Sequence, residues 1–192
     1  MASILEHAIE LRAQHTDMLN GRWYRSGRNS APDARHGHLD GKTLGLVGFG
    51  EIARAVVRRA NAFNMNCCAV TRSVREQAPD GLDWIGTQAE LPRLLNESDY
   101  IALTCDLNAE TEGMIDADAF ALMKPTAYLI NVARGEVIVE KALYTALKEQ
   151  RIDGAALDTW YRYPSTIENA EPDPDRGGPF QGSQYDLSLI HI

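Results

Sequence analysis

Short apolar runs alternate with longer amphipathic segments along this chain. The apolar runs are too short for helices and are rich in Val, Ile, Leu and Ala, so each predicts a buried strand. The predicted strands are residues 43–47, 67–70, 100–105, 128–132 and 154–157. Between them, apolar residues recur at helical spacing and predict helices. The predicted helices cover residues 53–63, 88–96, 116–123 and 139–150.

This order predicts an α/β fold. Strands that are apolar along their whole length are typical of parallel sheets covered by helices on both faces. A further helix is predicted over residues 3–18, because apolar residues line one side and Asn20-Gly21 provides a stop. The apolar side of that helix consists of Ile4, Leu5, Ala8, Ile9 and Ala13.

The first predicted strand ends in a glycine turn, Gly48-Phe49-Gly50-Glu51-Ile52-Ala53, which leads into a helix. In such a turn Gly48 permits the tight bend, Gly50 lets the backbone approach a pyrophosphate, and Ala53 allows close packing. The free N–H groups of the first helical turn then face the phosphates. The glycine string alone is weak, but the flanking strands and helix complete a βαβ unit. We therefore predict a dinucleotide site in a Rossmann-type doubly wound sheet.

The end of the second strand bears on the choice of nucleotide. NAD-specific sites place an acidic residue there, which bonds the ribose 2′-hydroxyl, whereas NADP sites use neutral and basic residues. Here the position is Thr71, followed by Arg72 and Ser73. A carboxylate would repel a 2′-phosphate and Arg72 would attract it, so we predict NADP in preference to NAD.

Ligands of open α/β sheets bind at the carboxyl ends of the strands. The residues just past those ends are 48–52, 71–73, 104–106, 133–135 and Asp158. Arg134 is notable among them, because a guanidinium beside Gly135 can present a fixed fork to a carboxylate. The alternative for Arg134 is a surface ion pair.

Composition and charge exclude several other classes of protein. A formal net charge of −8 argues against nucleic acid or an anionic membrane as a partner. No apolar run approaches the length of a membrane span, and Glu6 and His7 do not suit a signal peptide. His36 and His38 lack a carboxylate or cysteine partner, so we expect no metal site. The odd number of cysteines, Cys67, Cys68 and Cys105, all expected inside strands, indicates a reducing, cytoplasmic location.

Several motifs in this order resemble the nucleotide-binding domain of the D-isomer-specific 2-hydroxyacid dehydrogenases, the family of phosphoglycerate and glyoxylate/hydroxypyruvate reductases. The matching segments are residues 39–53, 122–125, 131–138 and 154–158, and the similarity covers roughly residues 2–164. The resemblance implies an NAD(P)-dependent oxidoreductase that acts on the CH–OH group of a 2-hydroxy acid, by hydride transfer to or from nicotinamide.

The resemblance also implies roles for individual residues. Arg134 would be catalytic, gripping the substrate carboxylate and carbonyl, and Asp158 would hold the nicotinamide carboxamide. Glu51 and Ile52 would lie under the pyrophosphate. The expected cofactor-binding residues are Gly48, Gly50, Glu51, Ile52, Thr71, Arg72, Ser73, Thr104, Cys105, Val132, Ala133 and Asp158. The expected partners are a small 2-hydroxy or 2-keto acid and a second copy of the chain, in a homodimer built partly through the first helix.

Three departures from the family pattern affect catalysis. Tyr163 stands where the family has a glutamate that supports the catalytic histidine, and it supplies no negative charge near neutral pH. The residues around His191 do not match those around the family histidine. This chain is also expected to lack the family's substrate domain. We expect residues 1–164 to form the NAD(P)-binding domain, with residues 1–20 as its linking helix and residues 165–192 as a flexible, truncated or artefactual tail.

These departures leave other functions open. The fragment is expected to be inactive alone, or to be a non-catalytic nucleotide-sensing and dimerisation module of the corepressor type. A different Rossmann enzyme, such as a hydrolase of nucleoside thioethers, would make the Arg134 and Asp158 motifs accidental.

Overall fold

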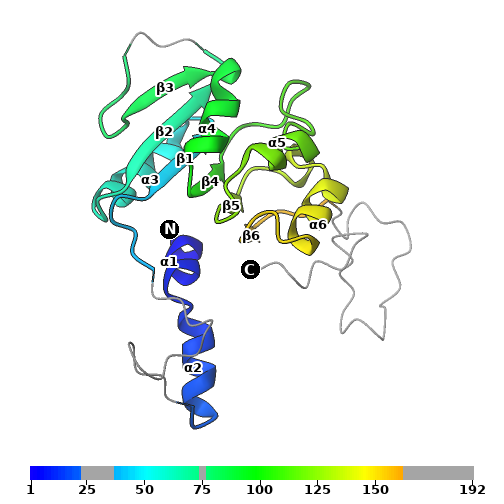
Figure 1. Ribbon diagram of the computed structural model, residues 1–192. Helices are drawn as coiled ribbons and strands as arrows, with labels where there is room; N and C mark the ends of the chain where they lie inside the picture. Colours follow the sequence, from blue (N-terminus) through cyan, green and yellow to red (C-terminus); the bar gives the residue numbers. More distant parts are fainter. Residues whose placement is uncertain (23–36, 74–76, 162–192) are drawn as a thin grey trace.

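A single parallel sheet organises the computed structural model, which describes residues 1–22, 37–73 and 77–161 (Figure 1). Its six strands lie in the order β3-β2-β1-β4-β5-β6, the doubly wound arrangement predicted from the sequence. The strands are β1 (Thr43–Val47), β2 (Asn66–Thr71), β3 (Trp84–Thr87), β4 (Tyr100–Leu103), β5 (Tyr128–Asn131) and β6 (Gly154–Leu157). All adjacent strands pair in parallel.

Helices cover both faces of this sheet, because alternate strand residues point to opposite sides. Leu44 and Leu46 of β1 pack in one core with helices α1 (Ala2–Ile9) and α3 (Glu51–Asn61). Val47 belongs to the other core, which is formed with three helices on the opposite face. Those helices are α4 (Leu91–Glu97), α5 (Ala117–Leu122) and α6 (Glu140–Lys148). Two short 3-10 helices, η1 (Gln88–Glu90) and η2 (Gly135–Val137), precede α4 and α6.

Most predicted elements are present, with a few corrections. Strand β3 was not predicted from the sequence. Strand β4 ends at Leu103, so Cys105 lies beyond the strand and not inside it as expected. Phe63, the last residue of the predicted helix over residues 53–63, follows the end of α3 and is 44% exposed.

The predicted helix over residues 3–18 is interrupted at Glu10. Glu10 has φ 47°, a left-handed conformation that cannot continue a right-handed helix, so α1 ends there and α2 (Leu11–Leu19) begins. Helix α1 buries Ile4 and Ala8, as expected, whereas no residue of α2 is buried. Figure 1 shows α2 extending away from the sheet, which explains why Ala13 is exposed and not part of an apolar side.

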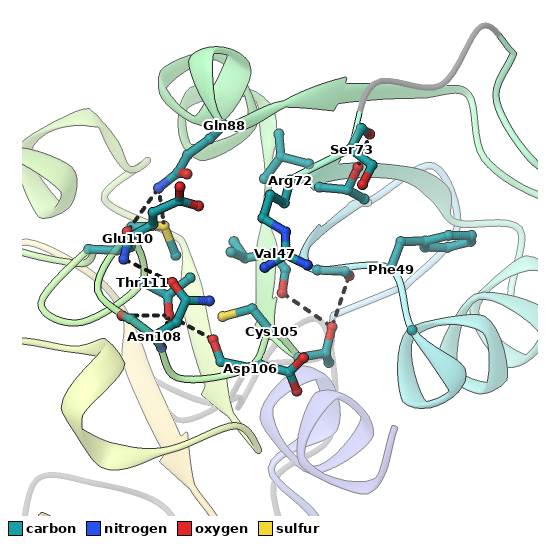
Figure 2. A pocket seen from close by; sticks show the side chains of 16 residues that line it. Val47, Phe49, Arg72, Ser73, Gln88, Cys105, Asp106, Asn108, Glu110 and Thr111 are labelled. Atoms are coloured by element: carbon teal, nitrogen blue, oxygen red, sulfur yellow. Dashed lines mark hydrogen bonds between the residues drawn. The ribbon is translucent and has the colours of Figure 1, made fainter.

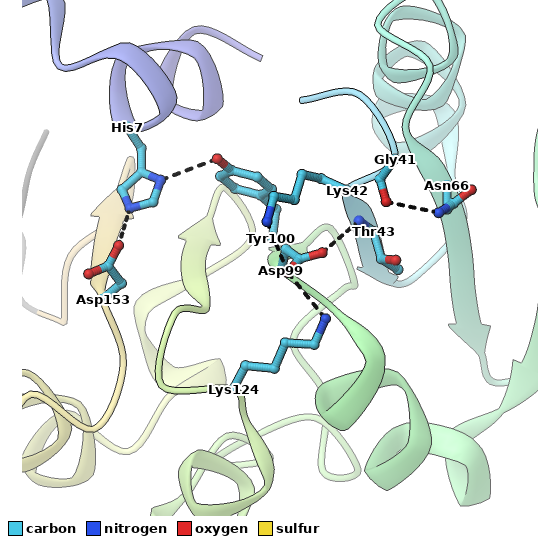
Figure 3. A network of polar contacts seen from close by, with 9 residues as sticks. All are labelled: His7, Gly41, Lys42, Thr43, Asn66, Asp99, Tyr100, Lys124 and Asp153. Carbon is cyan, nitrogen blue, oxygen red and sulfur yellow. Dashed lines mark hydrogen bonds and ion pairs between the residues drawn. The ribbon is translucent and has the colours of Figure 1, made fainter. Parts of the chain in front are cut away.

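His7 attaches α1 to the sheet near the amino ends of the strands (Figure 3). Its Nε2 lies 2.8 Å from Asp153 Oδ2 and its Nδ1 lies 3.3 Å from the Tyr100 hydroxyl. The imidazole also stacks on Tyr128, with ring centroids 4.0 Å apart. Because the His7 and Asp153 side chains are only 14% and 15% exposed, this contact is poorly screened by solvent.

A second polar cluster at the same edge ties β1 to β4 (Figure 3). Asp99 accepts a hydrogen bond from Thr43 N at 2.9 Å and forms ion pairs with Lys124 at 3.2 Å and Lys42 at 3.8 Å. The Gly48 turn and the other strand-end residues lie at the opposite, carboxyl edge of the sheet.

Some sequence predictions fall outside the described residues. These are Tyr163, His191, His36 and the tail over residues 165–192. Within the described ranges, no helix has both the length and the apolar character needed for a membrane span.

Candidate functional site

The Gly48 turn connects the carboxyl ends of three strands. Gly48 has φ +94°, and its N–H donates to Val70 O in β2 at 2.8 Å. The Thr104 hydroxyl donates to Gly48 O at 3.0 Å. A Cβ built on Gly48 would lie 2.8 Å from the Cys105 backbone, so both the positive φ and the close approach require glycine here.

A pocket of about 250 Å³ opens above this turn (Figure 2). Seven of the predicted cofactor-binding residues line it together: Gly48, Gly50, Thr71, Arg72, Ser73, Thr104 and Cys105. They come from the ends of β1, β2 and β4, although they are up to 57 positions apart in the chain. The carboxyl-edge rule therefore selected residues that the fold brings to one place.

The start of α3 has the features of a phosphate cradle. Gly50 is the N-cap of α3, and no side chain caps the helix. A Cβ on Gly50 would meet no heavy atom within 4 Å, so the space beside this backbone is open. Glu51 and Ile52 form the first turn of α3 and are exposed, outside the residues that line the pocket. Unsatisfied N–H groups and open space suit the pyrophosphate of a dinucleotide.

The end of β2 supplies the cation of this pocket. Arg72 and Ser73 are exposed, and the Thr71 hydroxyl donates to Ser73 O at 2.7 Å, which fixes the turn. Among the residues that the structure describes, Arg72 has no carboxylate in an ion pair with it. In Figure 2 its side chain extends into the pocket, with Asn108 and Glu110 on one side of it.

The loop after β4 forms a wall of the pocket that sequence analysis did not include. Beyond Asp106, which the strand-end rule covered, this loop contributes Asn108, Glu110, Thr111 and Met114, and η1 contributes Gln88. Apart from Met114, these side chains are polar, and all are half-buried or exposed, so no apolar periodicity marks them. Their position just after a strand that enters the site was the available signal.

Cys105 is half-buried in this pocket, unlike Cys67 and Cys68, which are buried in β2. Burial raises the pKa of the Cys105 thiol, although a hydrogen bond from its own backbone opposes the shift. The thiol therefore lines the pocket mainly as a neutral, weakly polar group.

Arg134 lies outside this pocket, after β5. Its Nη1 donates to Ala133 O at 2.8 Å, and among the described residues no carboxylate forms an ion pair with its guanidinium. The buried Asn131 fixes the backbone around it, because its Nδ2 donates to Arg134 O at 2.8 Å and its Oδ1 accepts from Ala133 N at 3.0 Å. Asn131 was not singled out from the sequence, where it is one residue of an apolar run.

Asp158 follows the neighbouring strand β6, and its N–H donates to Asn131 O at 2.9 Å. Its side chain is exposed. Val132 is half-buried and Ala133 is buried, both directly after β5, and neither lines the pocket beside Gly48. The structure thus groups the predicted residues into two sets along one edge of the sheet.

Gly135 joins the two turns that carry Arg134 and Asp158. A Cβ on Gly135 would lie 2.5 to 2.9 Å from backbone atoms of Trp160 and Tyr161. Real Cβ atoms do not approach backbone this closely, so glycine is required where the two turns touch.

Comparison with known proteins gives consistent relationships. The chain is 43% identical over 146 residues to a glyoxylate reductase of Pyrococcus furiosus, which covers 76% of this chain and 43% of the reductase. A solved acyclic imino acid reductase in complex with NADPH and D-Arg is 30% identical, with a TM-score of 0.72 over 92% of this chain and 52% of that chain. An NAD-dependent formate dehydrogenase of Staphylococcus aureus, solved with NAD, is 29% identical, with a TM-score of 0.71 over 84% of this chain and 46% of that one.

The chain spans less than half the length of the curated reductase that it matches. The family match itself extends over residues 1–172, which includes every strand and helix described above. By this match, the chain belongs to the D-isomer specific 2-hydroxyacid dehydrogenase family, as its NAD binding domain.

Proposed function

We propose that this chain is the nucleotide-binding part of an NAD(P)-dependent oxidoreductase that acts on the CH–OH group of a 2-hydroxy acid. One observation carries the proposal: Arg134, with no carboxylate partner in the described residues, and Asp158 follow adjacent strands at the sheet edge that also carries the Gly48 turn. A cation that cannot lose its charge, at the same sheet edge as a dinucleotide turn, suits a carboxylate substrate.

Each group of residues has a distinct task in this proposal. The N–H groups at the start of α3, with Gly50, would hold the pyrophosphate, with Glu51 and Ile52 beneath it. Thr104 and Cys105 would border the adenosine, and Val132, Ala133 and Asp158 would border the nicotinamide. When bound, the nicotinamide supplies or accepts the hydride. Arg134 would orient the acid through its carboxylate, which lowers the entropic part of the barrier.

NADP is the proposed coenzyme in preference to NAD. Thr71 stands where NAD-specific sites carry an acidic residue, and the exposed guanidinium of Arg72 follows directly. A 2′-phosphate there would gain a charge-assisted contact and meet no carboxylate at the strand end. One similar solved protein contains NADPH and another contains NAD. The proposed preference therefore rests on Thr71 and Arg72 of this chain and not on its relatives.

The activity is tested on the chain and on any longer gene product that contains it. Oxidation of NADPH is followed spectrophotometrically with glyoxylate or hydroxypyruvate, in the wild type, Arg134→Ala and Arg151→Ala. Arg151 is the matched control, an arginine that lies 3.9 Å from Glu149 away from the Gly48 pocket. We expect turnover that falls at least about 100-fold in Arg134→Ala only, equivalent to roughly 2.7 kcal/mol. Turnover that survives in Arg134→Ala would contradict the proposed substrate contact.

A nucleotide-sensing and dimerisation module is the second candidate, favoured by Tyr163 in place of the family glutamate. It would bind NADPH without turnover in every product tested.

In either case we propose a homodimer that involves the first helix, and a cytoplasmic location that suits three unpaired cysteines. Sedimentation velocity measures the first of these directly.

A further inference from the structure

The loop from Asp106 to Met114 is a preformed turn that walls one side of the nucleotide pocket. The Thr111 hydroxyl donates to Asp106 O at 2.7 Å, and Asn108 Oδ1 accepts from Glu110 N at 2.8 Å. Behind the loop, Gly113 N donates to Glu136 O at 2.8 Å, which ties it to η2. Since these hydrogen bonds define the shape of the loop, the width of the pocket depends on where the loop is held relative to Arg72 at the end of β2.

Gln88 holds the loop from η1, the 3-10 helix that directly follows β3 (Figure 2). Its Nε2 donates to Glu110 O at 3.0 Å and lies 3.4 Å from Met114 Sδ. Gln88 directly follows Thr87 of β3, and Thr87 pairs in register with Thr71 of β2. Gln88 therefore connects the edge of the sheet that carries Arg72 with the loop that faces it.

We propose that Gln88 is a positioning residue that sets the width of the adenosine half of the pocket. This inference rests on the proposed nucleotide site. The ligand class is an adenine nucleotide bound between Arg72 and the loop after β4. Without the amide donor, the loop loses its tie to η1 while its internal hydrogen bonds and its attachment to η2 remain. The loop after β4 must then be ordered when the nucleotide binds. This entropic cost lowers the affinity for the adenosine portion.

Gln88→Met tests this inference, because it keeps an unbranched side chain of similar length and removes the amide donor. Gln77→Met is the matched control, an exposed glutamine outside the residues that line the pocket. ADP-ribose and inorganic pyrophosphate are titrated calorimetrically into the wild-type chain and both variants, and each thermal midpoint is recorded. We expect Gln88→Met to bind ADP-ribose roughly three- to tenfold more weakly, the range of one net hydrogen bond, with pyrophosphate affinity and midpoint unchanged.

The possible failures are distinguishable. If the wild type does not bind ADP-ribose, the proposed nucleotide site fails, and the proposed function fails with it. If the wild type binds and Gln88→Met binds equally well, the positioning role is wrong and the proposed function stands. A parallel loss of ADP-ribose affinity, pyrophosphate affinity and thermal midpoint would assign Gln88 a structural role only and would also overturn the inference.

Discussion

Gly48 and Gly50 lie in the same turn, but the reasons for glycine at the two positions differ. Gly48 is needed by the fold, because of its positive φ and the Cys105 backbone beside it. Gly50 has φ −92° and open space around a built Cβ, so the fold alone does not need glycine there. A pyrophosphate in that space, as proposed above, would require glycine there.

Alanine substitutions should separate these two requirements. Gly48→Ala should lower the free energy of unfolding by about 1–3 kcal/mol, because a non-glycine residue is strained at that φ. Gly50→Ala should unfold like the wild type but bind NADPH at least about tenfold more weakly, because its methyl group occupies the phosphate cradle. Urea unfolding and calorimetry measure the two effects. Equal NADPH affinity in Gly50→Ala would argue against a pyrophosphate at this turn.

Arg72 governs the predicted preference between coenzymes. Arg72→Ala should weaken NADPH binding by about 1.5–3 kcal/mol, the range of a charge-assisted hydrogen bond, and leave NADH binding nearly unchanged. Arg58→Ala is the control, an exposed arginine of α3 that does not line the pocket. Calorimetric titration with both coenzymes measures the change. An NADH affinity equal to or above that of NADPH, unaffected by the substitution, would count against NADP.

Single residues of the site were predictable where chemistry and position coincide. The glycine turn and Arg134 stand at ends of strongly apolar runs, so the strand-end rule finds them. Gln88 and Asn131 were not, for different reasons. Gln88 follows a strand that gives little apolar signal, and Asn131 acts through buried hydrogen bonds that no periodicity reveals.

The secondary-structure elements follow the sequence where burial is complete. Strand β1 lies at the predicted residues because four of its five residues are buried. Strand β3 is an edge strand of four half-buried residues, so it lacks the continuous apolar run of the central strands. The break at Glu10 was not predictable, since helical spacing continues across it and the packing of α1 alone uses the apolar side.

Helix α1 depends on His7 for its attachment. His7→Ala removes contacts to Asp153 and Tyr100 and the stack on Tyr128, and should release α1 at a cost of about 1–3 kcal/mol. Hydrogen exchange should then accelerate in α1 and stay slow in β1. His15→Ala, in the exposed helix α2, is the control and should change neither. Unchanged exchange in α1 of the His7 variant would show that Ile4 and Ala8 suffice.

The whole molecule should lose stability in alkali. Burial raises the pKa of Cys67 to about 11 and that of Cys68 to about 12, with Asp83 adding to the first shift. Because both folded values exceed the ordinary 9.0, the unfolded chain loses these protons first. Their stabilisation is complete below pH 9 and declines as the pH rises toward 11 and 12.

Urea unfolding at about pH 8 and about pH 10 measures this loss. Above the ordinary thiol pKa, each thiol should lower the free energy of unfolding by up to roughly 1.4 kcal/mol per pH unit. The double variant Cys67→Ala, Cys68→Ala should lose less stability over this interval than the wild type. Tyr128 contributes only at higher pH, because burial raises its pKa from 10.0 to about 12. An identical pH dependence in the double variant would refute the assignment to these thiols.

The contact of Gly135 with the Trp160–Tyr161 backbone has a mechanical consequence for the whole edge of the sheet. With no room for even a methyl group between them, the two turns cannot slide past one another. An acid bound by Arg134, as proposed above, would thereby be held in register with a group bound at Asp158. Any substitution that separates the two turns would displace Arg134 and Asp158 relative to each other and so impair both proposed contacts.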